Sequence, residues 1–549
     1  MSRSMAALAS ALAAVCVAHA GTLDGDLERT MREAGENEAV STLVFLADRV
    51  DLGALKTELR AARVSLAERH RRVLTELQQR SAIAQPALLA HLAQLKQQGL
   101  AEYEAFWLAN CVRVDARPEV IRAIAARADV EHVFLNYRIE LIEPVAAPPT
   151  PAAQKTPAYQ QLSIPEPGLL AIRAPLVWSE LGFSGEGVLV ASLDSGVDGS
   201  HPALASRWAG VADPRYAGHP EWAWWDGIGQ NPNFPYDALG HGTHTMGTIT
   251  GGPPGDSVGV APKALWISST PNWQGQIGEF VSDAILIYQW MVNPDGDLDT
   301  HWDVPACCCN SWGLVTGHGY PPCDQLLWEY LDACETAGVA ILFAAGNEGA
   351  QGLRRPSDRA TTDYDTCAVA AVDANTPGWP IASFSSRGPT NCTPTGDPFI
   401  KPNIAAPGVQ VRSSIPGGGY GPNSGTSMAT PHITGVVALM RQACPNMEID
   451  VIKQIMYETA VDLGDPGKDN SYGWGMVDAY AAVKRALELC AAPCPGDLDG
   501  DGDVDQSDLG ILLADFGCAA DCAGDLDGDG DVDQGDLGIL LANYGQSCD

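Results

Sequence analysis

The sequence has few cationic side chains for its length. Its 549 residues include 33 Lys and Arg but 68 Asp and Glu, which gives a formal net charge of −35. The imbalance is steepest in residues 490–549, which hold fifteen aspartates and no Lys, Arg or Glu. A surface of this charge repels nucleic acids and anionic membranes. We therefore expect neither as a partner.

Long hydrophobic runs are absent after the first twenty residues. No later stretch reaches the roughly 18 apolar residues that a membrane-spanning helix needs, so we predict no transmembrane segment. Residues 1–20 contain Arg3, an apolar run from Met5, and the small residues Ala18 and Ala20 on either side of His19. This pattern is typical of a secretory signal peptide cut after Ala20. The sequence thus predicts a secreted protein, either extracellular or associated with the cell surface.

Cysteine, by contrast, is plentiful. The chain has 15 cysteines, which suits an oxidising compartment. Removing the signal peptide and the N-terminal region proposed below would leave thirteen, an odd number, so at least one thiol is free or pairs with another chain. No cysteine spacing is typical of a zinc site.

Three separate short motifs carry residues suited to nucleophilic catalysis. The apolar run 187–193 reads as a buried parallel strand and ends at Asp194, where open α/β sheets place their active sites. His241 begins the small-residue stretch His-Gly-Thr-His. Ser427 lies in Gly-Thr-Ser-Met-Ala-Thr-Pro-His, at the start of an apolar helix whose N–H groups and dipole favour developing negative charge.

Each motif also has a plain structural interpretation. Asp194 could be a turn or cap residue, and Ser427 could be a helix N-cap. His241 and His244 are three residues apart, but no third ligand follows at helical spacing, which argues against a metal site. We expect His244 and His432 to be structural histidines in the core.

Taken together, and in the order Asp, His, Ser, the motifs resemble those of the subtilisin-like serine proteases, a type case of this triad. The resemblance covers residues 165–488. It implies an α/β fold with a parallel sheet flanked by helices. It also implies that Ser427 is the nucleophile, that His241 is the general base and acid, and that Asp194 orients the imidazole.

A fourth motif, Ala-Ala-Gly-Asn-Glu-Gly over 344–349, extends the resemblance. It implies that Asn347 donates its amide to the oxyanion beside the backbone N–H of Ser427. The chain would then be a serine endopeptidase that hydrolyses peptide bonds in proteins through an acyl-enzyme. The alternative is an inactive scaffold of the same fold, a calcium-dependent binding or adhesion protein. The intact set of four residues favours the enzyme.

The resemblance also implies where a peptide substrate binds. Ser311, Trp312 and Gly313 would pair with it as an added strand. Together with Ala344, Ala345 and Gly346 they would line the first specificity pocket. Glu348 at the pocket rim suggests a basic residue before the scissile bond. The floor of the pocket cannot be placed from the sequence.

The length and the 46% hydrophobic content predict more than one domain. Residues 21–144 show strands near 42–47, 106–114 and 130–141, with helices over 50–100 and 118–127. This pattern resembles, more loosely, a subtilisin-family proregion, a small α+β inhibitor and folding template. The helical stretch is longer than usual, which leaves its role open, and an unrelated N-terminal domain is the alternative.

The remaining boundaries follow from composition. Residues 145–166 are rich in Pro and Ala and predict a semi-rigid linker, in which we expect the enzyme to cut itself during maturation. Residues 167–489 form the predicted peptidase domain. Its acidic stretch 294–303 could bind calcium, although a solvated loop is the simpler interpretation.

Residues 490–549 contain two near-copies of one unit, offset by 28 residues. Each has acidic side chains at the spacing of a calcium-binding loop, followed by an apolar helix, and hard cations prefer such oxygen ligands. The expected ligands are Asp497, Asp499, Asp501, Asp503, Asp505 and Asp508 in the first copy and Asp525, Asp527, Asp529, Asp531, Asp533 and Asp536 in the second.

This tail resembles dockerin modules, which are small all-α units built from loops and helices. The resemblance implies bound Ca²⁺ and a cohesin-type or other cell-surface partner, with 506–507 and 534–535 at the positions that vary with the partner. A disordered acidic tail is the alternative. We also expect one disulfide in each copy, Cys494–Cys518 and Cys522–Cys548.

Overall fold

The computed structural model describes most of the chain. The described residues are 21–35, 38–62, 64–145, 165–252, 257–274, 277–278, 280–314, 323, 325–490, 495–499, 503–518, 522–527 and 530–546. The predicted signal peptide and nearly all of the predicted linker lie outside these ranges. Among the described residues, no helix is both long enough and apolar enough to cross a bilayer. The chain divides into two compact units, residues 1–50 with 77–136 and residues 51–76 with 137–549.

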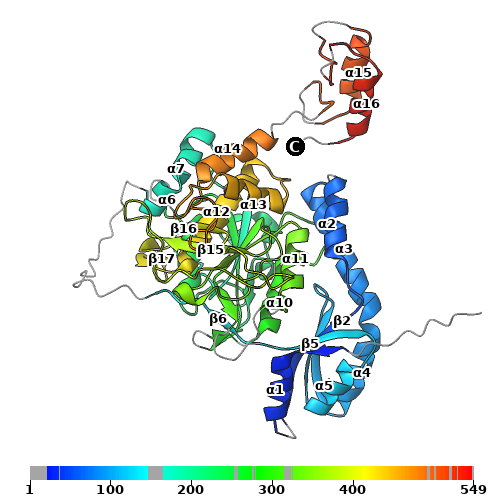
Figure 1. Ribbon diagram of the computed structural model, residues 1–549, viewed down its shortest axis with the longest axis vertical. Helices are drawn as coiled ribbons and strands as arrows, with labels where there is room; N and C mark the ends of the chain where they lie inside the picture. Colours follow the sequence, from blue (N-terminus) through cyan, green and yellow to red (C-terminus); the bar gives the residue numbers. More distant parts are fainter. Residues whose placement is uncertain are drawn as a thin grey trace, which may run out of the picture. The chain divides into compact units, whose positions relative to one another are not determined.

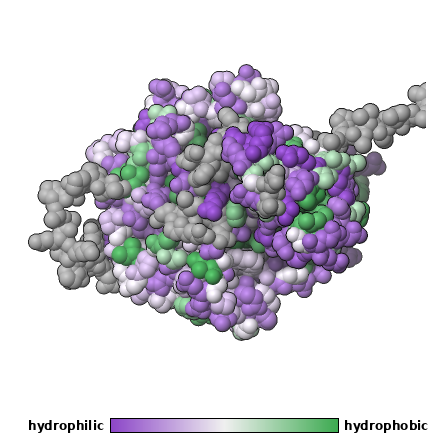
Figure 2. Space-filling view, turned by 90° about the horizontal axis from the view of Figure 1, so that it is seen from below, coloured by the Kyte–Doolittle hydropathy of each residue, from purple (hydrophilic) through white to green (hydrophobic). Residues whose placement is uncertain are grey.

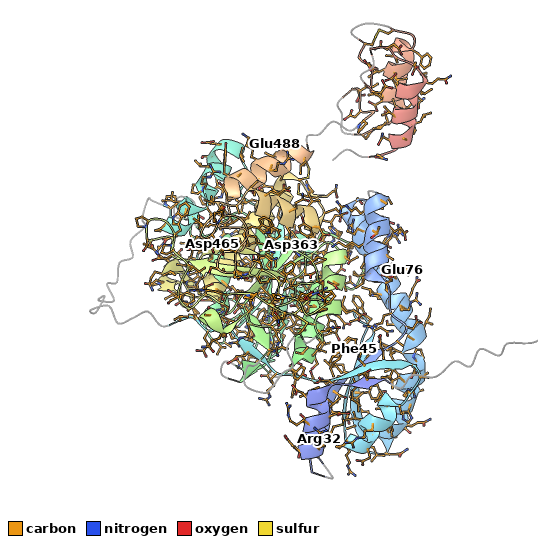
Figure 3. All side chains as sticks on the ribbon, in the orientation of Figure 1. Arg32, Phe45, Glu76, Asp363, Asp465 and Glu488 are labelled. Carbon is orange, nitrogen blue, oxygen red and sulfur yellow. A yellow bond between two sulfur atoms is a disulfide. The ribbon has the colours of Figure 1, made fainter. Side chains whose placement is uncertain are left out.

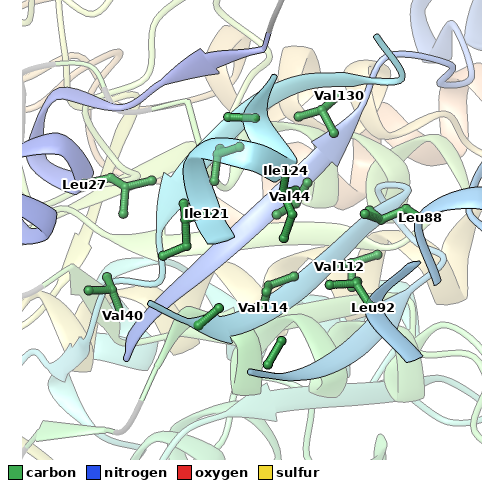
Figure 4. Close-up of a cluster of buried hydrophobic side chains, with 14 of the residues drawn as sticks. Leu27, Val40, Val44, Leu88, Leu92, Val112, Val114, Ile121, Ile124 and Val130 are labelled. Carbon is green, nitrogen blue, oxygen red and sulfur yellow. The ribbon is translucent and has the colours of Figure 1, made fainter. Parts of the chain in front are cut away.

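The first unit is a five-stranded sheet packed against helices. The strand order is β1-β5-β2-β4-β3. Its core is formed by aliphatic side chains such as Val44, Val112 and Ile121 (Figure 4). The strands are β1 (Thr22–Leu23), β2 (Val40–Leu46), β3 (Ala101–Phe106), β4 (Cys111–Ala116) and β5 (Val130–Leu135), and the helices are α1 (Gly25–Glu33), α4 (Pro86–Gln97) and α5 (Pro118–Ala125).

Two of the strands predicted for this region are wrong in detail. The stretch predicted as one strand near 106–114 is the hairpin of β3 and β4, because the chain turns at Trp107–Asn110, where Asn110 has φ of +46°. The stretch predicted as one strand over 130–141 is divided between β5 and the separate strand β6 (Ile139–Leu141). β6 belongs to the second unit.

The second unit is built on a seven-stranded sheet in which every neighbouring pair is parallel. Its strands are largely buried Val, Ile, Leu, Ala and Cys, as expected for a parallel sheet covered on both faces. This confirms the predicted α/β class. In sheet order the strands are β16 (Ile404–Pro407), β15 (Cys367–Val372), β14 (Ala340–Ala344), β12 (Cys307–Asn310), β7 (Leu189–Leu193), β9 (Leu265–Thr270) and β8 (Trp224–Asp226).

Helices surround this sheet (Figure 1). α12 (Thr426–Ala443) is buried along nearly its whole length and packs against β7, β12, β14, β15 and β16. α9 (His241–Thr250) packs against α12 and is entirely buried. The other helices are α6 (Pro167–Ala171), α7 (Ala174–Leu176), α8 (Ala209–Ala212), α10 (Val281–Met291), α11 (Trp328–Thr336), α13 (Ile449–Glu458) and α14 (Ala479–Cys490). The face shown in Figure 2 is mainly hydrophilic, with hydrophobic residues in scattered spots.

A second, four-stranded sheet in this unit joins segments that are far apart in sequence. Its order is β10-β11-β6-β13, from β10 (Trp273–Gln274), β11 (Ile277–Gly278), β6 and β13 (Trp312–Leu314). A hairpin of β17 (Val411–Ile415) and β18 (Gly419–Asn423) lies against α9. β6 therefore brings residues just before the predicted linker into the second unit.

Residues 51–76 also belong to the second unit, although the predicted proregion spans 21–144. They comprise α2 (Leu52–Ala61) and the first part of α3 (Leu66–Ala84). Helix α3 then continues into the first unit.

The tail contains α15 (Gln506–Asp515) and α16 (Gln534–Asn543), one in each copy of the repeat. Its small core is formed by Val504, Leu512, Val532 and Leu540, which are matching residues of the two copies.

Among the described residues, the disulfides are Cys323–Cys392, Cys444–Cys490 and Cys518–Cys522. The expected pairs Cys494–Cys518 and Cys522–Cys548 are therefore wrong, because Cys518 and Cys522 pair with each other across the short link between the two copies.

Candidate active site

Asp194 and His241 meet at the carboxyl end of strand β7. Asp194 directly follows the strand, and His241 is the first residue of α9. Its Nδ1 lies 2.7 Å from Asp194 Oδ1, and both side chains are buried. Burial disfavours the imidazolium, but the charge and hydrogen bond of Asp194 outweigh it, so the pKa of His241 is raised.

The Asp194 carboxylate is held from several sides. The backbone N–H of Ser195 donates to its Oδ1 at 2.7 Å, and the hydroxyl of Thr245 donates to its Oδ2 at 3.2 Å. Gly196 follows with φ of +93°, and a Cβ there would lie 2.0 Å from the carbonyl oxygen of Tyr236, so this tight turn requires glycine.

A second carboxylate, the half-buried Asp237, fixes the start of α9. It accepts hydrogen bonds from the Thr243 hydroxyl at 2.6 Å, from the Gly240 N–H at 2.7 Å and from the Ser195 hydroxyl at 2.7 Å. The hydroxyl of Ser195 therefore helps to stabilise the start of α9. The sequence analysis missed Asp237, whose signal is an acidic turn residue four positions before His241.

Ser427 lies in the first turn of α12. Its hydroxyl donates to the carbonyl oxygen of Ile142 at 2.7 Å. Within the described ranges, His241 Nε2 is buried and has no hydrogen-bond partner. The helices that begin near these two residues, α9 and α12, pack against each other.

Asn347 is the fourth polar residue of the site, after Asp194, His241 and Ser427. Its side-chain oxygen accepts from the backbone N–H of Thr426 at 2.9 Å and from the Thr426 hydroxyl at 3.0 Å. These two bonds fix which way the amide points, and its Nδ2 donates to the carbonyl oxygen of Glu143 at 2.8 Å. Thr426 is a positioning residue that the sequence analysis did not single out.

The chain's own segment 139–145 runs through this site as an extended peptide. β6 pairs antiparallel with β13, and the N–H of Ile142 donates to the carbonyl oxygen of Ser311 at 2.8 Å. Further along, the N–H of Val145 donates to the Ser424 carbonyl at 2.7 Å. The charge of Glu143 also contributes to the raised pKa of His241. The backbone of the segment thus contacts both Ser427 and Asn347.

Three of the expected substrate-binding residues contact this segment. Ser311, Trp312 and Gly313 form the edge with which β6 pairs. Ala344 ends β14, and the N–H of Gly346 donates to the Thr426 hydroxyl at 3.2 Å.

Glu348 does not present a free carboxylate to this site. Its Oε1 is bound by the guanidinium of Arg354, with Arg354 Nε at 2.9 Å, and its Oε2 accepts from the Ser386 hydroxyl at 2.9 Å. The suggested preference for a basic residue therefore loses its physical basis, because the charge of Glu348 is already neutralised.

His244 and His432 are buried structural residues, as expected. His244 Nε2 lies 3.0 Å from the Val411 carbonyl, and His432 Nδ1 lies 2.9 Å from the Met428 carbonyl. Burial lowers the pKa of each to about 4, so both are neutral near pH 7.

The tail brings its acidic side chains together. In the first copy, Asp497, Asp499 and Asp508 place ligand oxygens within 4.8 Å of one another, as do Asp503, Asp505 and Asp508. The second copy has the matching groups of Asp525, Asp527 and Asp536 and of Asp531, Asp533 and Asp536. These all-oxygen sets fit a hard cation such as Ca²⁺. Asp501 and Asp529 lie outside the described residues.

Across the described ranges, such groups occur in the tail alone. The acidic stretch near Asp295 does not form one. Burial and the neighbouring charge of Asp295 raise the pKa of Asp303 to about 7.

The chain is similar to known proteins in sequence and in fold. Residues 185–475 match the model of Peptidase_S8, the Subtilase family. Bacillopeptidase F of Bacillus subtilis (strain 168) is 32% identical over 444 residues, which cover 75% of this chain and 29% of that protein. Subtilisin E of the same organism is 30% identical over 325 residues, which cover 58% of this chain and 71% of that protein.

Among solved structures, the chain is similar to fervidolysin from Fervidobacterium pennivorans, which is described as a keratinolytic enzyme related to subtilisin. The TM-score is 0.52 with 21% identity, and the match covers 82% of this chain and 61% of that chain. This likeness supports the fold. The chain spans less than a third of bacillopeptidase F and somewhat under two thirds of fervidolysin.

Proposed function

The chain belongs to the subtilase family, and from that premise we propose that it is a serine endopeptidase that hydrolyses peptide bonds in proteins. One observation carries the proposal. The backbone of Ile142 and Glu143 lies between the Ser427 hydroxyl and the Asn347 amide, beside a buried Asp–His pair. A nucleophile, a base and an oxyanion donor thus surround one peptide segment.

The proposed reaction assigns each group one task. Ser427 Oγ attacks the carbonyl carbon while His241 Nε2 takes its proton. Asp194 keeps the proton of His241 on Nδ1 and stabilises the imidazolium. The Asn347 amide and the Ser427 N–H stabilise the oxyanion. The intermediate collapses when His241 protonates the leaving nitrogen, and water then hydrolyses the ester by the same groups.

We further propose that residues 21–142 are an inhibitory proregion and that the enzyme cuts itself after Ile142. The carbonyl of Ile142 accepts from the Ser427 hydroxyl and the Ile142 N–H donates to Ser311, whereas the Asn347 amide donates to the next carbonyl, that of Glu143. The bond that follows Glu143 involves the nitrogen of Pro144, so the bond between Ile142 and Glu143 is the better candidate. This places cleavage just before the predicted linker, 145–166.

N-terminal sequencing after expression in a protease-free host tests the proposal. The wild type should yield a product that begins at Glu143 and cleaves a quenched fluorescent peptide. Ser427→Ala should stay unprocessed and inactive. Ser195→Ala, the matched control, should retain measurable activity because its hydroxyl only braces α9. Processing of Ser427→Ala at the same bond would refute self-cleavage.

For the tail we propose a calcium-binding dockerin-like module in a secreted protein. The repeated aspartates would hold Ca²⁺, which supplies the charge neutralisation that folds each loop. Each copy also exposes two apolar side chains at matching positions, Leu513 and Phe516 in the first and Leu541 and Tyr544 in the second. These residues could contact a cohesin-type or other cell-surface partner. Calcium-dependent retention of the secreted chain on a cohesin, lost on chelation, would support this role.

The inactive-scaffold alternative makes a different prediction. It keeps the tail function but predicts no turnover of any peptide by the wild type. The same peptide assay therefore separates the two functions.

A further inference from the structure

We propose that Arg354 makes this site prefer peptides with a carboxylate at the position of Glu140, two residues before Ile142. This inference rests on the proposed peptidase function and names a feature of its substrates. It starts from an ion pair in the segment that occupies the site. Arg354 Nη1 lies 2.7 Å from Glu140 Oε2.

The backbone register makes Glu140 a stand-in for a substrate residue. It pairs with Gly313 of β13, and Ile142 follows two residues later against Ser427. A peptide that extends β13 in the same register would place its own side chain where that of Glu140 lies. The ion pair is therefore a contact that a substrate can reproduce.

Arg354 is held so that one edge of its guanidinium faces this position. Its backbone N–H donates to the Ala345 carbonyl at 2.8 Å, and its Nε and Nη2 bind Glu348. The side chain is 10% exposed. It packs beneath Gly313, where a Cβ would lie 2.3 Å from Arg354 Cγ. A guanidinium fixed in this way loses little entropy when it binds a second carboxylate.

The charges predict an order among substrates. Glu at this position offers both charge and a hydrogen-bond acceptor to Nη1, whereas Gln offers only the acceptor. Lys brings a second cation against Arg354, and Glu348 is already paired. Charge-assisted bonds are stronger than neutral ones, and partly exposed pairs are weakened by solvent. We expect kcat/KM to fall about threefold to tenfold from Glu to Gln, and further for Lys.

The test uses three quenched fluorescent peptides that span residues 138–145, identical except for Glu, Gln or Lys at the position of Glu140. The processed wild type should rank them Glu, Gln, Lys. Arg354→Gln should flatten the ranking, and Arg354→Lys should restore part of it. Arg355→Gln, which removes a neighbouring charge, should keep the wild-type ranking.

The outcomes separate this inference from the proposed function. Equal cleavage of all three peptides by the wild type would overturn the role of Arg354 while supporting the peptidase. No cleavage of any peptide by enzyme that has been separated from its cut proregion would contradict the peptidase itself. The comparison of peptides on the wild type does not depend on whether a variant folds.

A different set of contacts carries a second inference. We infer that residues 51–76, the extra helices of the predicted proregion, dock on the peptidase domain away from the active-site segment and keep the cut proregion bound. The segment ends at Glu76, within α3 (Figure 3). Two ion pairs anchor it. Lys56 Nζ lies 2.7 Å from Asp450 Oδ1, and Arg69, whose side chain is 5% exposed, pairs with Glu448.

Close packing and hydrogen bonds accompany these two ion pairs. A Cβ at Gly338 would lie 2.3 Å from Leu66 Cδ1, so the leucine fits directly against the glycine. The Leu66 N–H donates to Asn446 Oδ1 at 3.0 Å. His70 is buried, and its Nε2 lies 2.6 Å from the Val292 carbonyl. The contact combines packing, hydrogen bonds and charge, as a specific interface does.

Two attachment points have a kinetic consequence. After the chain is cut at the active site, the helices would hold the inhibitory strand at a high effective concentration. The processed enzyme should therefore remain inhibited until the helices dissociate or are degraded.

Charge reversal tests this inference in the full chain. After processing, the proregion should co-elute with the wild-type enzyme in size-exclusion chromatography. Glu448→Lys with Asp450→Lys should speed its loss at least about tenfold, since each attraction becomes a repulsion. Adding Lys56→Glu should restore part of the retention. Glu458→Lys, on the same helix but outside the contact, should behave like the wild type.

Equal retention of the cut proregion by the wild type and the double variant would overturn this inference. So would a loss of the proregion from Glu458→Lys as fast as from the double variant. A chain that is never processed would instead contradict the proposed self-cleavage.

Discussion

Replacing Asp194 with Asn changes one charge in the site and almost no volume. Asn can still accept the Ser195 N–H through its side-chain oxygen. It cannot be an anionic partner for His241 Nδ1, which now lies 2.7 Å from the carboxylate. The neutral variant therefore isolates what the charge of Asp194 contributes.

We expect this change to lower the turnover rate and to lower the pKa of His241. The imidazole loses the partner that fixes its tautomer and stabilises its cation. Other triads of this kind lose about 10⁴ in turnover on the same substitution, or roughly 5 kcal/mol of transition-state stabilisation. In addition, burial then lowers the pKa of His241 without the opposing charge. Because the base acts only when neutral, the acid limb of the pH profile should move to lower pH.

The assay is a pH–rate profile of kcat/KM on a fluorescent peptide. The variant cannot mature by itself, so a trace of wild-type enzyme supplies the cut and is then removed. Asp237→Asn is the matched control, because Asp237 is a half-buried carboxylate whose charge also raises the pKa of His241. That variant should shift the acid limb with a much smaller loss of rate. A loss of less than tenfold for Asp194→Asn would refute the assigned role.

Three other changes give distinct outcomes. Asn347→Ala should lower kcat about 10²-fold to 10³-fold with little change in KM, a range known from subtilisin itself, and an unchanged kcat would remove Asn347 from the oxyanion site. Lys453→Met should lower the free energy of unfolding by about 3–5 kcal/mol, because it leaves the buried Glu335 unpaired. Urea unfolding measures this loss, and Lys484→Met, at an exposed lysine, should leave the free energy of unfolding nearly unchanged. Calorimetric titration of the Ser427→Ala chain should show calcium binding that Asp508→Asn and Asp536→Asn each reduce, and unchanged binding in both would contradict the proposed ligands.

The proposed active-site residues could be selected from the sequence because each lies in a short motif near the end of a strand or the start of a helix. Asp194 follows a run of buried residues, and Ser427 lies in the first turn of a helix that is buried along nearly its whole length. The parallel sheet follows from the same runs. Local sequence therefore carries much of the information about this edge of the molecule.

Other features depend on contacts between distant segments, which local patterns do not specify. Arg354 is only six residues after Glu348, but no local pattern shows that the two pair, or that Glu140 comes from a distant strand to share the guanidinium. The helical period of residues 51–76 predicts an apolar face but not the surface that covers it. The hairpin of β3 and β4 was missed because one backbone turn at Asn110 interrupts a continuous apolar pattern.

The most direct test of the central claim is covalent labelling of the processed enzyme with a fluorophosphonate, followed by peptide mapping. The account predicts one labelled residue, Ser427, with no label in Ser427→Ala and strongly reduced labelling in Asp194→Asn. Label on Ser195, or undiminished labelling of Ser427→Ala, would contradict it.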